Sequence, residues 1–157
     1  MQEEDRTSEE SLCRKLLNMT WRPLLETMQK LIKSQIDEAS CQMLLRAYQS
    51  CIGACGTANC FEARDAFLTS LCMQCVSVPY AYMSASSHQS KKSFEFEITE
   101  RNILMCKTLF NISHCLCHIL DVKSWFVILE TMQNIEYVIM RRGSSSNQHF
   151  KLPTINF

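Results

Sequence analysis

Apolar residues recur every three or four positions along most of this sequence, and this spacing restricts the possible folds more than any other feature. It places the apolar side chains on one face of an α-helix, whereas a half-buried strand would need strict alternation. The 157 residues contain only three glycines and three prolines, so few positions interrupt the helical pattern. The sequence therefore predicts an all-α domain with a single hydrophobic core.

The first predicted helix starts near residue 8, because Thr7 and Glu10 have the spacing of a capping box. Pro23 is unfavourable inside a helix but suits a first turn, so a second helix is predicted to start at Thr20. That helix is expected to end near Ser34.

Each later helix is predicted to start at a polar residue that can cap it, namely at Asp37, Asn59, Thr99, and Asp121 or Ser124. Gly53 and Gly56 are expected to loosen and close the helix that starts at Asp37. The last two helices are expected to end near Leu120 and Gly143. The residues predicted to be buried on these helices are Leu24, Leu25, Met28, Leu31, Ile32, Met43, Leu44, Ala47, Tyr48, Cys51, Ile52, Phe61, Ala63, Ala66, Phe67, Ser70, Leu71, Ile103, Leu104, Cys106, Leu109, Phe110, Ile112, Ser113, Trp125, Ile128, Leu129, Met132, Ile135 and Ile139.

The sequence divides into three predicted parts. Residues 1–19 form a short helix with a polar lead, residues 20–142 form the helical domain with a long polar loop at 77–98, and residues 143–157 form a flexible tail. Antiparallel helix pairs bury such stripes most simply, and either a closed bundle or an α-solenoid would do so. The helix pairs recur at intervals close to the roughly 40 to 47 residues of armadillo and HEAT units, which favours a solenoid segment.

The charge balance argues against a nucleic-acid-binding protein. Sixteen basic residues match sixteen acidic ones, so the surface as a whole has no field to hold a phosphate backbone. The amino terminus is acidic without an apolar signal segment, and no apolar run approaches the roughly 20 residues of a membrane span. We therefore expect a cytoplasmic protein. Lys91 and Lys92 in the polar loop would add only a weak attraction to acidic headgroups.

Ten cysteines leave a second interpretation open, that of a small metal-binding or redox protein. Cys72 and Cys75 have zinc-ribbon or redox spacing, and Cys115, Cys117 and His118 offer further ligands. His114 and His118 lie four positions apart, as on one helix face. Most cysteines, however, fall among aliphatic residues at helical spacing, where a reduced cysteine behaves as a small apolar side chain. We expect no catalytic residue, metal site or cofactor.

Three sequence segments carry a family resemblance: Glu62–Leu71 with its Arg-Asp-Ala-Phe centre, Thr99–Leu109, and the stretch that starts at Ser124. In this order, over about residues 20 to 140, the sequence resembles the helical region downstream of the Sec-seven catalytic domain in large Arf exchange factors. Trp21 and the Val-Pro-Tyr-Ala stretch at 78–81 resemble most closely the Mon-two (monensin-sensitivity) family, which lacks that catalytic domain. The residues that carry the resemblance are Trp21, Arg64, Asp65, Ala66, Phe67, Asn102, Ile103, Leu109, His114, Ser124 and Trp125.

The resemblance implies a scaffold in vesicle traffic and protein transport at the trans-Golgi network and endosomes, peripherally attached to membranes. Its implied partners are Arf-type or Arl-type small GTPases or other trafficking proteins, with no exchange activity of its own. Family chains are much longer, so this sequence is expected to be a fragment, a truncated gene product or a short relative. We expect the recognisable residues to be structural: Arg64 and Asp65 as either a local solvated pair or a tie to a neighbouring helix, and Trp125 as a core residue.

Overall fold

The computed structural model describes residues 2–75 and 98–145, which form five α-helices and one short 3-10 helix. The elements are α1 (Gln2–Lys33), α2 (Glu38–Thr57), α3 (Phe61–Cys75), α4 (Glu100–Cys115), η2 (Cys117–Ile119) and α5 (Val122–Ser145). These ranges contain no strand, so the predicted all-α class is confirmed. Most of the predicted loop at 77–98 and the tail after Ser145 lie outside the described residues.

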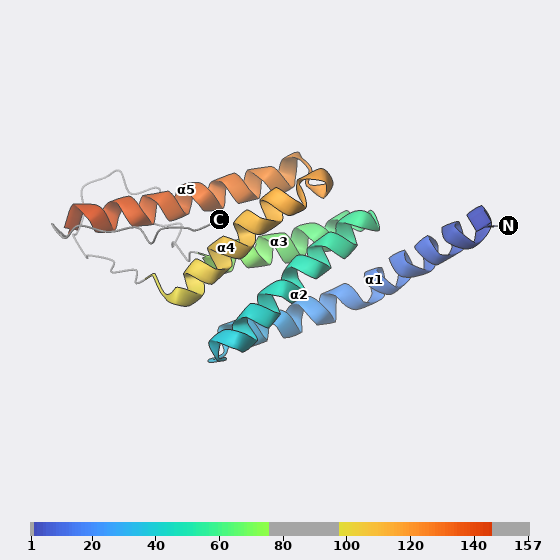
Figure 1. Cartoon of the computed structure of the whole chain (residues 1–157), viewed down its shortest axis with the longest axis horizontal. Coiled ribbons are helices and arrows are strands. Elements are labelled where there is room, and N and C mark those ends of the chain that lie inside the picture. Colours follow the sequence, from blue (N-terminus) through green and yellow to red (C-terminus); the bar gives the residue numbers. More distant parts are fainter. Residues whose placement is uncertain (1, 76–97, 146–157) are drawn as a thin grey trace.

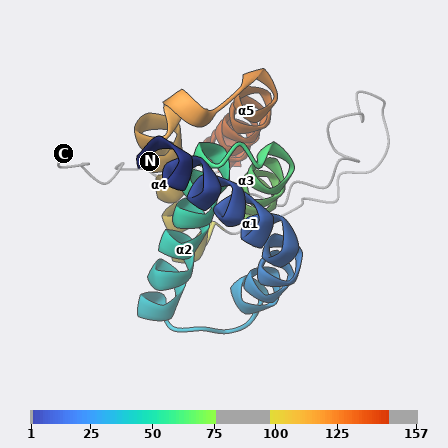
Figure 2. The same ribbon diagram turned by 90° about the vertical axis from the view of Figure 1, so that its right-hand side faces the viewer.

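Helix α3 lies at the centre of the molecule and packs against α1, α2, α4 and α5. Figure 1 shows that consecutive helices run back and forth, with α1 and α5 on opposite sides of α3. The view along the other axis shows the same order, with α2 and α4 together flanking α3 (Figure 2). The two outer helices therefore each have a face that no other described helix covers.

The core is built mainly from α2 and α3. Tyr48 and Phe67, both fully buried, meet edge to face with ring centroids 6.1 Å apart. The Tyr48 hydroxyl shares a hydrogen bond of 3.2 Å with the Ser70 hydroxyl, to which Gln29 of α1 donates at 3.0 Å. Burial raises the pKa of the Tyr48 phenol. A satisfied polar pair at this point links three helices without leaving a buried hydroxyl unbonded.

Helix α1 is longer than the sequence predicts, because it runs unbroken through Thr20 and Pro23. The expected helix start at Thr20 is wrong: its hydroxyl donates to the carbonyl of Leu16, 2.7 Å away, as inside a helix. Pro23 has no N–H to donate to the preceding turn, and a proline inside a helix lowers the helix's stability by about 3 kcal/mol. Tertiary packing offsets it, because Trp21 and Leu25 contact the core on either side of the proline.

The link between α2 and α3 also differs from its prediction. Asn59 does not start α3; it closes α2 with a φ of 56°, a left-handed conformation that asparagine tolerates better than most residues. Gly53 does not interrupt α2, and the helix ends at Thr57, one residue after Gly56, close to the predicted end. A side chain at Gly56 would place its Cβ 2.9 Å from the Cβ of Ile119, so glycine at this position allows η2 to pack closely on α2.

Other helix ends agree more closely with the sequence. Asp37 caps α2 by accepting a hydrogen bond of 3.2 Å from the Ser40 N–H, as predicted. Helix α4 ends at Cys115 and η2 fills the interval to Leu120, while α5 continues two residues beyond Gly143. Short 3-10 turns are frequent at the ends of α-helices, and η2 is such a turn.

Several residues predicted to be buried are exposed instead. They are Leu24, Leu31, Met43, Ala47, Phe61, Ile103, Phe110, Leu129 and Ile139. Each lies at the margin of a helix's apolar face or beyond it, where periodicity alone does not show which residues a neighbouring helix covers. The exposed residues therefore mark the edges of the contacts made within this chain.

Candidate functional site

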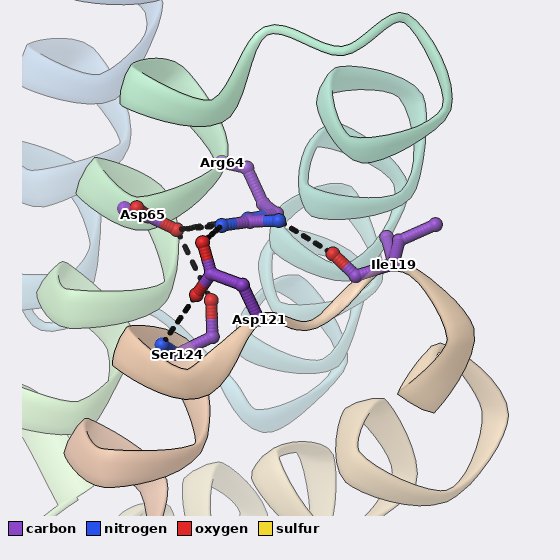
Figure 3. Close-up of polar contacts among 5 residues, drawn as sticks. All are labelled: Arg64, Asp65, Ile119, Asp121 and Ser124. Atoms are coloured by element: carbon purple, nitrogen blue, oxygen red, sulfur yellow. Dashed lines mark hydrogen bonds and ion pairs between the residues drawn. The ribbon is translucent and has the colours of Figure 1, made fainter.

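Arg64, from the first turns of α3, is the centre of the largest polar network in the described residues. Its side chain is only 1% exposed, and all three guanidinium nitrogens donate hydrogen bonds (Figure 3). Nε donates to Asp65 at 2.8 Å, Nη1 to the Ile119 carbonyl at 2.5 Å, and Nη2 to Asp121 at 2.6 Å. One buried cation thus joins α3 to the η2 turn and to the start of α5.

Ser124 and Asp121 complete this network from the α5 side. Asp121 occupies the N-cap position of α5: its Oδ1 accepts from the Ser124 N–H at 2.9 Å, and its carbonyl accepts from the Trp125 N–H at 3.0 Å. The Ser124 hydroxyl donates to Asp65 at 3.1 Å. Asp121 was one of two predicted starts for this helix, and the structure selects it over Ser124.

The hydrogen bonds of the network favour the ionised forms of Asp121 and Arg64. The N–H of Ser124 and the Arg64 guanidinium lower the pKa of Asp121 to about 2. Burial acts to lower the pKa of Arg64, but its hydrogen bonds to Asp65 and Asp121 outweigh burial and raise it. A permanently charged arginine whose three nitrogens are all bonded within the protein is suited to a structural tie. The predicted structural role of the Arg64–Asp65 pair matches this geometry.

Asn102 makes a second tie, between the end of α3 and the start of α4. Thr99 caps α4 as predicted, and the Asn102 side chain completes a capping box by accepting from the Thr99 N–H at 3.0 Å. The same amide donates to the Cys75 carbonyl at 3.1 Å. Asn102 therefore satisfies one orphan group at each of two helix ends.

Arg101 has a similar role that sequence reasoning missed. Its guanidinium donates to the carbonyls of Ile32, Ser34 and Ile36, at 3.1, 2.9 and 2.9 Å, and so caps the carboxyl end of α1. The only sequence signal was a basic residue beside a capping threonine. Its partners lie 65 to 69 positions away, so the sequence could not identify them.

The remaining family residues do not gather at one site. Phe67 and Leu109 are core residues, whereas Trp21 and Ala66 pack against the core at its edge. Ile103 and His114 are exposed. Trp125, predicted to be a core residue, is only half-buried; the buried side of the described part of α5 carries Ser124, Ile128 and Thr131.

The cysteine pair with metal-like spacing lies inside α3. Cys72 and Cys75 are both buried, and burial raises the pKa of Cys72 to about 11. A hydrogen bond with Cys106, together with burial, raises the pKa of Cys75. Within residues 2–75 and 98–145, no three histidine, cysteine or acidic side chains are arranged to hold a metal ion. At Cys72 and Cys75 the raised pKa favours the protonated, unreactive thiol, whereas the hydrogen bond with Cys75 lowers the pKa of Cys106.

Apolar side chains form an exposed stripe along α5. We call Val122, Phe126, Leu129 and Met140 the α5 stripe; they are 85%, 68%, 58% and 67% exposed. Their spacings of four, three and eleven residues place them on one helix face. Leu12, Leu16 and Met19 form a similar exposed stripe on α1. Val122, Phe126 and Leu129 follow one another along this face, whereas Gln133 and Glu136 separate them from Met140. Exposed apolar faces of this kind mark contact sites for proteins or membranes.

None of the described helices combines the length and the apolar content needed to cross a membrane. The α5 stripe alternates with polar positions such as Lys123, Glu130 and Gln133, so it belongs to an amphipathic helix and not to a spanning one.

Sequence comparison identifies distant relatives. The chain is 23% identical to the human protein MON2 homolog over 167 aligned positions, which cover 83% of this chain and 10% of the relative. It is likewise 23% identical to the Xenopus laevis MON2 homolog, over 86% of this chain and 10% of the relative. A shorter segment of 61 residues is 36% identical to the Drosophila melanogaster MON2 homolog and covers 39% of this chain and 4% of that protein.

The resemblance to the Mon-two family is thus confirmed as distant homology over most of the chain. The chain spans about a tenth of the length of the human and Xenopus relatives. No family model matches it, and no solved structure matches it.

Proposed function

We propose that this distant MON2 homologue is a non-catalytic scaffold segment that acts in vesicle traffic and protein transport at the Golgi and endosomes. The homology to MON2 proteins supports the proposal, since the family is expected to work there without an exchange domain of its own. The best-defined polar groups of the structure, those around Arg64, Arg101 and Asn102, bind other parts of the same chain. These groups stabilise the fold, so contacts with partner proteins are left to other exposed residues.

The α5 stripe is the observation that carries this proposal. In an α-solenoid each helix pair buries its outer apolar face against the next pair, so a segment of a solenoid has apolar faces at its ends. Helices α1 and α5 lie on opposite sides of α3, and each carries an exposed stripe. We propose that the chain is an armadillo-like or HEAT-like segment, equivalent to the helical region downstream of the Sec-seven domain, and that partner proteins contact it through these faces.

The implied partners are Arf-type or Arl-type small GTPases. A test measures binding of the purified chain to such GTPases loaded with GDP or with a non-hydrolysable GTP analogue, and follows the fluorescently tagged chain in cells with a trans-Golgi marker. The proposal expects nucleotide-dependent binding and enrichment at Golgi or endosomal membranes. Diffuse distribution together with equal or absent binding in both nucleotide states would contradict it.

Two double variants test whether the α5 stripe itself makes the contact or whether any exposed apolar residue does. The double substitution Phe126→Glu and Leu129→Glu places two charges on exposed stripe positions, and we expect it to abolish both the binding and the enrichment. The matched control, Met43→Glu with Met73→Glu, changes two comparably exposed apolar residues on α2 and α3. If the control variant loses as much binding and enrichment as the stripe variant, the α5 stripe is not the contact surface.

A further inference from the structure

A surface groove of about 300 Å³ runs between α2 and α4, away from both outer helices and from the Arg64 network. Its lining is Gln42, Leu45, Arg46 and Gln49 from α2, and Leu104, Lys107, Thr108 and Asn111 from α4. The two helices contribute the same spacing of three, four and seven residues, so each presents a single face. Figures 1 and 2 show these two helices side by side.

The groove has an apolar base and basic sides. Leu45 is almost fully buried and Leu104 is half-buried, whereas Arg46 and Lys107 are exposed, one on each helix. At the end of the groove the Asn111 amide donates to Gln49 Oε1 at 3.0 Å and joins the two helices. Gln49 accepts this bond through its side-chain oxygen, so the bond does not use its side-chain N–H groups.

The charges around the groove are uneven. No acidic residue lines it, and neither Arg46 nor Lys107 takes part in an ion pair with another described residue. The nearest acid along α2 is Glu38, which accepts a hydrogen bond of 3.0 Å from Gln42 at the margin. Arg101, one turn before Leu104, is engaged with the end of α1. Two cations that pair with no acid among the described residues, one on each helix, thus line a groove with an apolar base.

We propose that this groove binds an acidic, extended peptide segment of a partner protein. Seven helical residues span about 10 Å, which matches about three residues of extended chain. An apolar side chain of such a segment contacts Leu45 and Leu104, while neighbouring carboxylates pair with Arg46 and Lys107. A nucleic acid fits less well, because two cations release too few counterions to hold a phosphate backbone. The proposal does not depend on the proposed role in vesicle traffic.

Fluorescence anisotropy with the whole 157-residue chain tests the proposal. The probe is a fluorescein-labelled peptide of about ten residues in which glutamates alternate with small apolar residues; the control probe replaces each glutamate with glutamine. We expect saturable binding of the acidic probe that weakens as salt is raised, and binding at least about tenfold weaker for the glutamine probe. Absence of saturable binding, or equal affinity for the two probes, overturns the proposal.

Charge reversal locates the binding. R46E combined with K107E should weaken binding of the acidic probe by at least about tenfold and should create affinity for a lysine-containing version of the same peptide. Both residues are exposed, and circular dichroism and urea unfolding check that the variant folds. The control, K15E combined with K123E, makes the same change of charge on α1 and α5. Equal loss in this control would show a general charge effect and would overturn the groove as the site.

Discussion

At the scale of single residues, Arg64 explains why a short motif in α3 is so recognisable. Its side chain is buried, and it holds the Ile119 carbonyl and the Asp65 and Asp121 carboxylates in fixed positions. Removal of the guanidinium loses these bonds and leaves a cavity, while the carboxylates regain water because they are 35% and 47% exposed.

We therefore expect Arg64→Ala to lower the free energy of unfolding by about 2 to 4 kcal/mol. Arg64→Lys should recover only part of this loss, since an ammonium group cannot replace a planar fork with three bonded nitrogens. Urea unfolding followed by circular dichroism measures both. Arg22→Ala is the control: its exposed ion pair with Glu62 predicts a change within about 1 kcal/mol. An Arg64→Ala variant as stable as the control would rule out the structural tie.

Asp121 gives the tie a pH dependence. Its pKa in the folded chain is about 2, below the ordinary value of 3.8, so its contribution is present above pH 4 and is lost as the pH falls towards 2. Because the side chain is nearly half exposed, solvent screening reduces the contribution to about 1 kcal/mol. Urea unfolding at several pH values between 5 and 2 should show a shallower loss of stability for Asp121→Asn than for the unchanged chain. Parallel curves would mean that Asp121 does not contribute.

The sequence predicted part of this site and not the rest. The adjacent Arg64 and Asp65 suggested either a local solvated pair or a tie to a neighbouring helix, and Asp121 was one of two predicted starts for the last helix. The partners of Arg64 lie 55 and 57 positions away, and their distance depends on the η2 turn. Local spacing contains no information on such contacts, which arise only when α3 and α5 pack.

At the scale of helices, the ends of the elements are joined to one another. Asn102 completes the cap of α4 and donates to the last carbonyl of α3, and Arg101 binds three carbonyls at the end of α1. Helix ends buried in this way need partners for their free carbonyls.

We expect Asn102→Ala to lower the free energy of unfolding by about 1 to 3 kcal/mol, because it removes two helix-end bonds at once. Asn102→Asp keeps an oxygen for the Thr99 N–H but loses the N–H that reaches Cys75, so its loss should be smaller. Thermal unfolding and hydrogen exchange of α3 amides measure these effects. If the aspartate variant were as stable as the unchanged chain, or if α3 amides near Cys75 kept full protection in both variants, the bond between the helices would be unimportant.

The helices were predictable where pattern and caps agree and unpredictable where packing overrides them. Asp37 and Thr99 cap as their sequence context indicates, since a cap needs only its own next turn. Pro23 lies inside α1 because the residues on both sides of it pack on the core, and Asn59 closes α2 because the chain must reverse there. Both outcomes depend on tertiary contacts that a local pattern does not include.

At the scale of the whole molecule, exposed apolar side chains lie along both outer helices. The core lies between α2 and α3, the Arg64 and Asn102 ties fix α4 and α5 around it, and the outer faces of α1 and α5 remain apolar. If the outer faces of α1 and α5 contacted no other protein segment, polar residues on them would make the chain more soluble. The retained apolar residues are consistent with the proposed solenoid contacts.

The exposed apolar side chains of α5 predict concentration-dependent self-association of the isolated chain through the α5 stripe. Analytical ultracentrifugation should show association that Phe126→Glu with Leu129→Glu abolishes, with unfolding free energy changed by no more than about 0.5 kcal/mol, because both side chains are exposed. Met43→Glu with Met73→Glu should leave the association intact. A strictly monomeric chain at high concentration, without binding of a dye specific for apolar surface, would indicate that these faces need no covering and would remove the main support for a solenoid segment.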